Sequence, residues 1–307
     1  MYDIIIIGLG PAGISAAIYA KRSNMNILTI EAGPIGGLLN NIDIIKNYPG
    51  YYNIKGPNLA FNMFQQLKDL NVPTVNEPVT KVEKDNNVFK VTTTNKEYQA
   101  KKVIIAIGRK ARKLGLNDED RFLGKGLSYC AICDGPLYKG KDVCVVGGGN
   151  SAVQETIYLA GIVNKVYLVH RNSSFRATDE LVNKLKDINN VEIIMNENVT
   201  KINGTNNIQS VTLQSGKELP VSALFTFIGY LPGTSFLNNL DICDETGYIR
   251  VDNAMATPIN GIYAAGDIIK QDYYQIVMAT MEGATAALNA IKAIKTEWIL
   301  GFFFILW

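Results

Sequence analysis

The sequence predicts an α/β protein of two doubly wound domains, the second inserted into the first. Three observations predict this architecture. A strand–glycine turn–helix–strand pattern begins at Asp3 and is repeated from Asp142. A third apolar strand, which ends in Gly-Asp, follows late in the chain, after the second repeat. The length of 307 residues is enough for about two domains of roughly 150 residues each.

The first repeat opens with the apolar, β-branched run Ile4–Ile7, which is typical of a buried parallel strand. A glycine turn, a helical stretch (Ile14–Lys21) and a second strand (Asn26–Ile30) follow. The turn has the spacing G-x-G-x-x-G. Its first glycine makes a tight turn, its second lets a pyrophosphate approach the backbone, and its third lets helix and strand pack closely. The helix start then offers N–H groups to the phosphates. This Rossmann-like site comprises Gly8, Gly10, Pro11, Ala12 and Gly13.

The second repeat has the same order, with a strand at Asp142–Val146, a helix at Val153–Ala160 and a strand at Lys165–Val169. A single G-x-G-x-x-G motif is weak evidence, because glycine turns are common. Two copies in a complete strand–turn–helix–strand context predict two dinucleotide sites. The residues of the second turn are Gly147, Gly149, Asn150, Ser151 and Ala152.

The residue after each second strand distinguishes the two sites. Glu31 stands in the first repeat, where a carboxylate accepts hydrogen bonds from both ribose hydroxyls and repels a 2′-phosphate. The first site is therefore predicted to bind FAD. His170 and Arg171 stand in the second repeat, with Arg176 nearby, and guanidinium groups suit a phosphate. The second site is predicted to bind NADPH rather than NADH. A solvated basic loop is the alternative for the two arginines.

The segment Gly261–Asp267 reads as a buried strand that ends in Gly266 and Asp267, an aspartate that can bond the ribityl chain of a flavin. The alanine-rich stretch Gly283–Ile294 is predicted to be a helix whose N-terminus points its dipole at the isoalloxazine. The FAD-binding domain is then split. The predicted domains are 1–112 (FAD-binding, first part), 113–241 (NADPH-binding, with a cysteine pair) and 242–307 (FAD-binding, second part, with an apolar tail).

Composition excludes several classes of function. With 30 basic and 28 acidic side chains, the net charge of +2 provides no large basic field for nucleic acid. One histidine and four cysteines argue against a histidine-rich metal site and a disulfide-stapled secreted scaffold. The N-terminus lacks the basic segment of a signal peptide, and a cytoplasmic location is expected. The apolar run Trp298–Trp307 is shorter than the ~20 residues that span a bilayer.

The segment Cys130-Ala131-Ile132-Cys133-Asp134-Gly135 is predicted to be the redox centre. Two intervening residues put the sulfurs within disulfide reach and let one thiol stabilise the thiolate of the other. Such a pair reduces a partner disulfide by thiolate attack and resolution. Asp134 is placed to exchange a proton with a thiolate. Half of a zinc site and a pair of inert structural thiols are the alternatives, and no metal is expected.

These motifs, in this order, resemble the low-molecular-weight thioredoxin reductases of the class II pyridine-nucleotide disulfide oxidoreductases. The resemblance covers about residues 1–295, and the cysteine motif followed at once by the second glycine turn is highly specific. The matching segments are Gly8–Gly13, Gly36-Gly37, Asn47–Gly50, Ala106–Gly108, Cys130–Gly135, Gly147–Ala152, His170-Arg171, Phe227–Gly229 and Gly261–Asp267.

The resemblance implies a homodimer that passes electrons from NADPH through FAD to the Cys130–Cys133 disulfide and on to thioredoxin or a thioredoxin-like protein. It implies that Asp134 is the proton-donating acid. It places Glu31, Asn47, Asp267 and Gln275 around the FAD, and Arg171 and Arg176 at the 2′-phosphate. One flavin face has to serve both the nicotinamide and the disulfide, so the inserted domain is expected to rotate about hinges near Arg112–Leu114 and Leu240–Cys243.

Four departures from the family pattern bear on the electron donor. Asn172 replaces the second arginine of the usual His-Arg-Arg, Leu38 replaces the glutamine after Gly36-Gly37, and Tyr274 replaces the basic residue before Gln275. The tail Trp298–Trp307 is apolar where a polar helix is usual. A ferredoxin-dependent flavin thioredoxin reductase without a functional NADPH site is therefore the alternative. The intact second glycine turn, with Arg171 and Arg176, favours the nicotinamide donor.

Overall fold

The computed structural model describes residues 1–42 and 44–305, with side chains as far as Thr296. The side chains of the apolar segment Trp298–Trp307 therefore lie outside the described residues. The chain divides into two compact units. The first contains Met1–Ile42, Tyr48–Lys110 and the chain from Leu231 onward, and the second contains the short segment that ends at Asn47 together with Ala111–Tyr230. The predicted division into cofactor-binding domains at 112/113 and 241/242 stays a prediction.

The first unit is built on a mixed sheet in the order β3-β2-β1-β6-β5-β4, with β17 paired to β6. Strands β3, β2, β1, β6 and β17 are parallel, and β4 and β5 extend the sheet in antiparallel fashion. Ile4–Ile7 are almost completely buried, as expected of a central strand covered on both faces. The strands are β1 (Tyr2–Ile7), β2 (Ile27–Glu31), β3 (Thr74–Asn76), β4 (Val79–Asp85), β5 (Val88–Thr93), β6 (Glu97–Ile105) and β17 (Ile262–Ala264).

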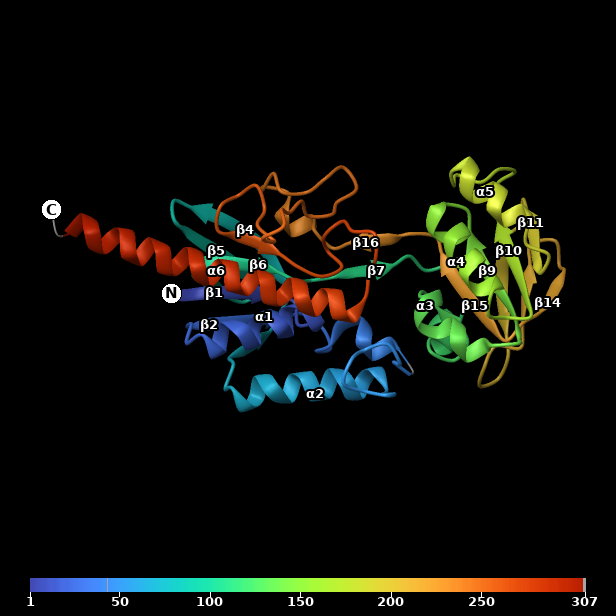
Figure 1. Cartoon of the computed structure of the whole chain (residues 1–307), viewed down its shortest axis with the longest axis horizontal. Helices are drawn as coiled ribbons and strands as arrows, with labels where there is room; N and C mark the ends of the chain where they lie inside the picture. Colours follow the sequence, from blue (N-terminus) through green and yellow to red (C-terminus); the bar gives the residue numbers. More distant parts are fainter. Residues whose placement is uncertain (43, 306–307) are drawn as a thin grey trace. The chain divides into compact units, whose positions relative to one another are not determined.

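Helices α1 (Pro11–Arg22) and α6 (Ile276–Ile305) of this unit pack against each other, and α2 (Gly56–Asp69) packs on α1 (Figure 1). The prediction that a helix begins near Gly283 is wrong, because α6 begins at Ile276. Gly283 lies where α6 crosses α1, and a Cβ there would come within 2.0 Å of the Ala12 carbonyl oxygen. This glycine therefore serves close helix packing. The short helices are η1 (Gly37–Asn41) and η4 (Ser235–Leu237).

The second unit has a five-stranded parallel sheet in the order β11-β10-β9-β15-β8 and a small antiparallel sheet, β12-β13-β14. Its parallel strands are β8 (Leu127–Ser128), β9 (Asp142–Gly147), β10 (Lys165–His170), β11 (Val191–Met195) and β15 (Ala223–Phe227). The antiparallel strands are β12 (Val199–Asn203), β13 (Ser210–Leu213) and β14 (Glu218–Pro220). Its helices are η2 (Glu119–Phe122), α3 (Ala131–Asp134), η3 (Gly135–Tyr138), α4 (Asn150–Ala160) and α5 (Asp179–Lys186).

The chain passes between the units in strands β7 (Arg109–Ala111) and β16 (Tyr230–Pro232), which pair with each other. The parallel strands of the two main sheets, with their crossover helices, confirm the predicted α/β fold class of two Rossmann-like domains. Within the part of the chain that the structure describes, no helix has the length and apolarity needed to cross a membrane.

Candidate functional site

The cysteine pair lies at the start of α3, and Cys130 and Cys133 form a disulfide with their Cα atoms 5.3 Å apart. Cys130 is the N-cap of the helix, with extended backbone angles. Its sulfur accepts a hydrogen bond from the backbone N–H of Cys133 at 3.2 Å. An N–H group aimed at a sulfur favours the thiolate over the thiol. The sulfur of Cys130 is therefore prepared to carry negative charge after reduction.

Ser128 connects Asp134 to the cysteine segment. The Ser128 hydroxyl donates to Asp134 Oδ2 at 2.6 Å, and its oxygen accepts the backbone N–H of Cys130 at 3.1 Å. The backbone N–H of Asp134 in turn donates to the Cys130 carbonyl oxygen. Ser128 is buried, while Cys130, Cys133 and Asp134 are partly exposed. These contacts hold the Asp134 carboxylate beside the disulfide segment, and its predicted exchange of a proton with a sulfur stays a prediction.

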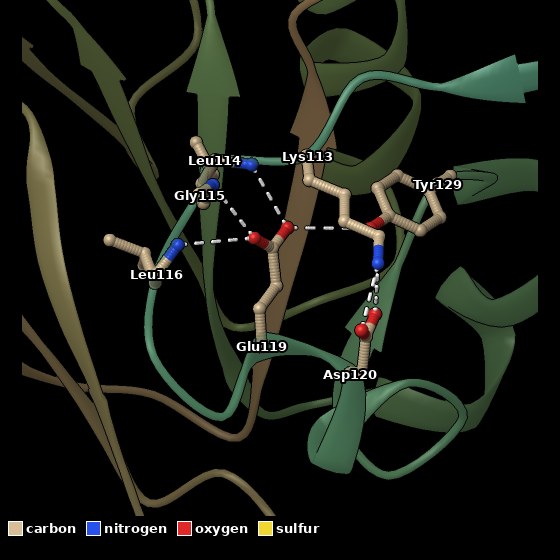
Figure 2. Close-up of polar contacts among 7 residues, drawn as sticks. All are labelled: Lys113, Leu114, Gly115, Leu116, Glu119, Asp120 and Tyr129. Carbon is tan, nitrogen blue, oxygen red and sulfur yellow. Dashed lines mark hydrogen bonds and ion pairs between the residues drawn. The ribbon is translucent and has the colours of Figure 1, made fainter.

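A buried carboxylate supports the residue that precedes Cys130. Glu119 accepts backbone N–H groups from Leu114 at 3.0 Å, Gly115 at 2.9 Å and Leu116 at 3.3 Å, and it contacts the Tyr129 hydroxyl at 3.4 Å (Figure 2). Burial and the nearby negative charge of Glu119 raise the pKa of Tyr129. Glu119 thus connects the segment that follows β7 to Tyr129.

The second connecting strand reaches the same residue. The hydroxyl of Tyr230, the first residue of β16, donates to the Tyr129 carbonyl oxygen at 2.8 Å. Tyr129 is therefore bonded directly to β16 through its carbonyl oxygen, and it is linked to the segment after β7 through Glu119.

The first glycine turn leaves space beside the start of α1. A Cβ at Gly8 would lie 2.4 Å from the Ala106 carbonyl oxygen, whereas a Cβ at Gly10 would meet no protein atom within 4 Å. No described side chain caps the start of α1, which begins with Pro11. Glu31 lies at the end of β2, and its Oε2 accepts the Leu9 N–H at 2.6 Å. Open space, uncapped N–H groups and an adjacent carboxylate fit the adenosine half of a dinucleotide.

Other predicted FAD residues gather at this turn. The Gly36 N–H donates to the Leu9 carbonyl oxygen, and Gly37 lies against Gly10. Gly266 has a φ of +78°, and a Cβ there would lie 2.9 Å from the Ala12 Cβ. This places Asp267 near the start of α1. Pro11, Ala12 and Gly13 form the first residues of α1.

Two further predicted FAD residues, Gln275 and Asn47, lie in segments other than the first glycine turn. Gln275 immediately precedes α6, and its carbonyl oxygen accepts the N–H of Ala279. Asn47 lies on an exposed loop between η1 and α2 and groups with the second compact unit. Its position at the cofactor stays a prediction.

The second glycine turn repeats the features of the first. A Cβ at Gly149 would meet no protein atom within 4 Å, and no described side chain caps α4, which begins with Asn150, Ser151 and Ala152. A Cβ at Gly147 would lie 2.6 Å from the Ala152 Cβ. The small residue at the third motif position therefore lets helix and strand approach, as predicted for a dinucleotide turn.

The loop after β10 is attached to this turn. The N–H of Arg176 donates to the Gly148 carbonyl oxygen at 2.7 Å, and the side chains of Arg171 and Arg176 are exposed. The His170 ring is buried beside Gly148, stacks on Phe175 and contacts the Ser174 carbonyl oxygen at 3.0 Å. Burial lowers the pKa of His170. His170 therefore shapes the loop, and the two arginines are the groups free to meet a phosphate.

Sequence reasoning missed four polar residues of these sites. Ser128 and Glu119 accept backbone N–H groups, and these contacts form only in the folded chain. Glu282 of α6 is buried and accepts the Gly266 N–H at 2.8 Å, and Arg109 lies 3.6 Å from Asp267. Glu282 had one available signal, since it is a charged residue within an apolar, alanine-rich helical stretch.

Comparison with known proteins places the chain in context. The family model for pyridine nucleotide-disulphide oxidoreductases matches residues 2–283. A thioredoxin reductase from Mycoplasma genitalium is 42% identical over 296 residues, which cover 94% of each chain. A thioredoxin reductase structure from Streptococcus pyogenes has a TM-score of 0.93 at 39% identity, covering 96% of this chain and 99% of that one. A ferredoxin-flavin thioredoxin reductase from Clostridium acetobutylicum has a TM-score of 0.54 at 33% identity, covering 96% and 98%.

Proposed function

Because the chain belongs to the pyridine nucleotide-disulphide oxidoreductase family and is of the low-molecular-weight thioredoxin reductase type, we propose that it takes electrons from NADPH and delivers them to thioredoxin. It is an oxidoreductase that acts on a disulfide, and FAD is its cofactor. The observation that carries the proposal is the Cys130–Cys133 disulfide with Asp134 bonded beside it. Bound FAD supplies two-electron transfer between the nicotinamide donor and this disulfide.

The chain's own residues perform the exchange with thioredoxin. In the reduced enzyme, the Cys133 N–H stabilises a thiolate on Cys130, which attacks one sulfur of the thioredoxin disulfide. This attack forms a mixed disulfide and releases the other thioredoxin sulfur as a thiolate. Cys133 then attacks the Cys130 sulfur, which closes the enzyme disulfide and releases the remaining thioredoxin sulfur as a second thiolate. Asp134 takes the Cys133 proton and returns it to a departing thiolate. Two electrons pass to thioredoxin, and both disulfides are accounted for.

The partner is expected to dock around α3. Ile132 lies between the two cysteines, and Leu137 lies in the following turn, η3. Both side chains are more than a third exposed, at 37% and 38%. Exposed apolar side chains beside a reactive disulfide suit a protein partner whose own disulfide must come within bonding distance.

The donor assignment is supported by the second glycine turn and its arginines. The open position at Gly149 and the uncapped start of α4 fit a pyrophosphate, and Arg171 and Arg176 fit a 2′-phosphate. Ferredoxin is the second candidate donor. It is favoured by Asn172, which removes one expected cation from the loop, and by the similarity to a ferredoxin-flavin thioredoxin reductase.

Anaerobic mixing of the oxidised, FAD-loaded protein with NADPH tests the proposal. We expect rapid loss of flavin absorbance with NADPH and its recovery when thioredoxin is added. Loss of absorbance with reduced ferredoxin, and none with NADPH or NADH, would replace the donor and keep the disulfide chemistry. Cys133→Ser is expected to trap a mixed disulfide with thioredoxin, whereas Cys130→Ser traps none. Turnover that survives both substitutions would refute the proposal.

The proposed assembly is a homodimer in a reducing cytoplasm. A groove of about 550 Å³ between α1, α2 and α6 is lined by apolar side chains that include Ile14, Ile18 and Met63. Tyr19, Met281 and Leu288 line the same groove and are exposed. A second copy is expected to cover this surface, as the family resemblance implies. Sedimentation would then show a dimer for the native chain and a monomer for Met281→Glu/Leu288→Glu.

A further inference from the structure

Arg109 is the first residue of β7, and it forms a close stack with Tyr274 in the loop before α6. The guanidinium carbon lies 3.3 Å from the centre of the tyrosine ring. The Arg109 Nε lies 3.6 Å from Asp267 Oδ2, and the Arg109 side chain is only 10% exposed. A planar guanidinium suits this position because it can stack on a ring while its edge faces a carboxylate.

The surroundings of Asp267 make this cation important. Burial raises the pKa of Asp267, and the Arg109 charge lowers it. Glu282 adds a second buried carboxylate, whose pKa is also raised by burial and by the charge of Asp267. Tyr248 faces Arg109 from the chain between η4 and β17, with its hydroxyl 3.5 Å from Nη1. Arg109 therefore offsets negative charge in a region that holds two carboxyl groups.

The loop around Tyr274 carries a second sign of a ligand. The N–H of Gln271 contacts the Tyr274 hydroxyl at 3.4 Å. The side-chain amide nitrogen of Gln271 is buried without a hydrogen-bond partner among the described residues. Native proteins rarely leave such a donor unpaired, so an acceptor beyond the described residues is expected there, and a bound ligand can supply it.

In the family that this chain resembles, the residue before the glutamine is basic, and here it is Tyr274. We propose that Arg109 supplies from β7 the positive charge that the family carries at position 274, and that it orients Asp267 as the acceptor for hydroxyl groups of the bound cofactor. Tyr274 provides the flat surface that holds the guanidinium in place. Arg109 is thus a positioning residue, and it acts through Asp267. The inference rests on the proposed placement of Asp267 in the FAD site.

The test measures FAD binding to the apoprotein by quenching of flavin fluorescence, together with the absorption spectrum of the bound flavin. Arg109→Met removes the charge and keeps an unbranched apolar side chain on the ring. We expect about tenfold weaker FAD binding, the cost of one charge-assisted contact. Tyr274→Phe keeps the ring under the guanidinium and should weaken FAD binding less than Arg109→Met does. Arg109→Met/Tyr274→Arg restores the charge from the other side and should recover most of the affinity.

Recovery in the double variant separates an electrostatic role from a merely structural one, because a damaged β7 would not be repaired by an arginine at position 274. Arg109→Met that binds FAD like the native chain, or a double variant no better than Arg109→Met, would overturn the inference. If the methionine variant does not fold, Arg109→Gln, which also removes the charge, provides the same comparison. Asp267→Asn separates the two levels of the argument. Native FAD affinity in that variant would instead overturn the proposed placement of Asp267.

Discussion

Replacing Glu119 by glutamine tests the support beneath the disulfide segment. The side chain keeps its size but loses its charge and one of its two acceptor oxygens. The native carboxylate is only 3% exposed and accepts three backbone N–H groups, from Leu114, Gly115 and Leu116. One amide oxygen cannot serve all three, because the Leu114 N–H points at a different carboxylate oxygen from the other two.

The expected loss of stability follows from the number of N–H groups that bond to Glu119. In either orientation of the glutamine amide, at least one partly buried N–H faces an –NH2 group and loses its acceptor. Leaving a buried donor unpaired costs about 1–3 kcal/mol, and a partly buried donor costs less because water can reach it. We therefore expect the free energy of unfolding to fall by about 1 kcal/mol, the lower end of that range. We also expect faster hydrogen exchange at Leu114–Leu116 and, through Tyr129, at Cys130.

Urea unfolding followed by circular dichroism, together with hydrogen-exchange mass spectrometry, measures both effects. The matched control is Asp120→Asn, which removes the neighbouring charge in the same short helix. Asp120 pairs with Lys113 at 2.7 Å (Figure 2), but both side chains are more than half exposed. This control should leave stability and exchange unchanged. Equal stability of the two variants, with native exchange at Leu114–Leu116, would refute the reasoning.

Three other sites give outcomes of their own. Asp134→Asn should lower the rate of thioredoxin reduction by about 10²-fold or more. Ser128→Ala should lower it less, because the Asp134 carboxylate remains. Steady-state kinetics with thioredoxin compares the two rates. Arg176→Ala should raise the KM for NADPH about tenfold and leave that for NADH unchanged. Burial raises the pKa of Glu155 to about 7, so the native chain loses stability as pH rises from about 4.5 to 7. Glu155→Gln should therefore be more stable by about 2 kcal/mol at pH 8, with an advantage that shrinks toward pH 5 in urea titrations.

The fold class and the glycine turns could be predicted because each is written in a short contiguous segment. The run Ile4–Ile7 and the turn after it need no distant partner to be recognised. The same holds for the cysteine pair, since a two-residue spacing limits how far apart the sulfurs can lie. Gly283 misled the prediction of α6 because a glycine at a helix crossing and one at a helix start look alike in sequence.

The polar support of the sites could not be predicted, because it depends on contacts made only in the folded chain. Arg109 meets Tyr274 and Asp267 across more than half of the sequence. Ser128 is close in sequence to its partners Cys130 and Asp134, but a serine two residues before a cysteine does not by itself predict these hydrogen bonds. In the sequence, Glu119 is one acidic residue in a charged segment. Its role depends on the folded position of the Leu114–Leu116 backbone, whose N–H groups it accepts.

The bonding of Tyr129 bears on how movement would reach the disulfide. Its hydroxyl is bonded to the carboxylate that holds the chain after β7, and its carbonyl oxygen is bonded to the first residue of β16. When a domain rotates about two connecting strands, the residues bonded to those strands are displaced least. If the second unit rotates about β7 and β16, Cys130 is displaced little and mainly changes its orientation, because it follows Tyr129, which is bonded to β16 and, through Glu119, to the chain after β7. The outer strand β11, at the far edge of the sheet, travels the longer arc.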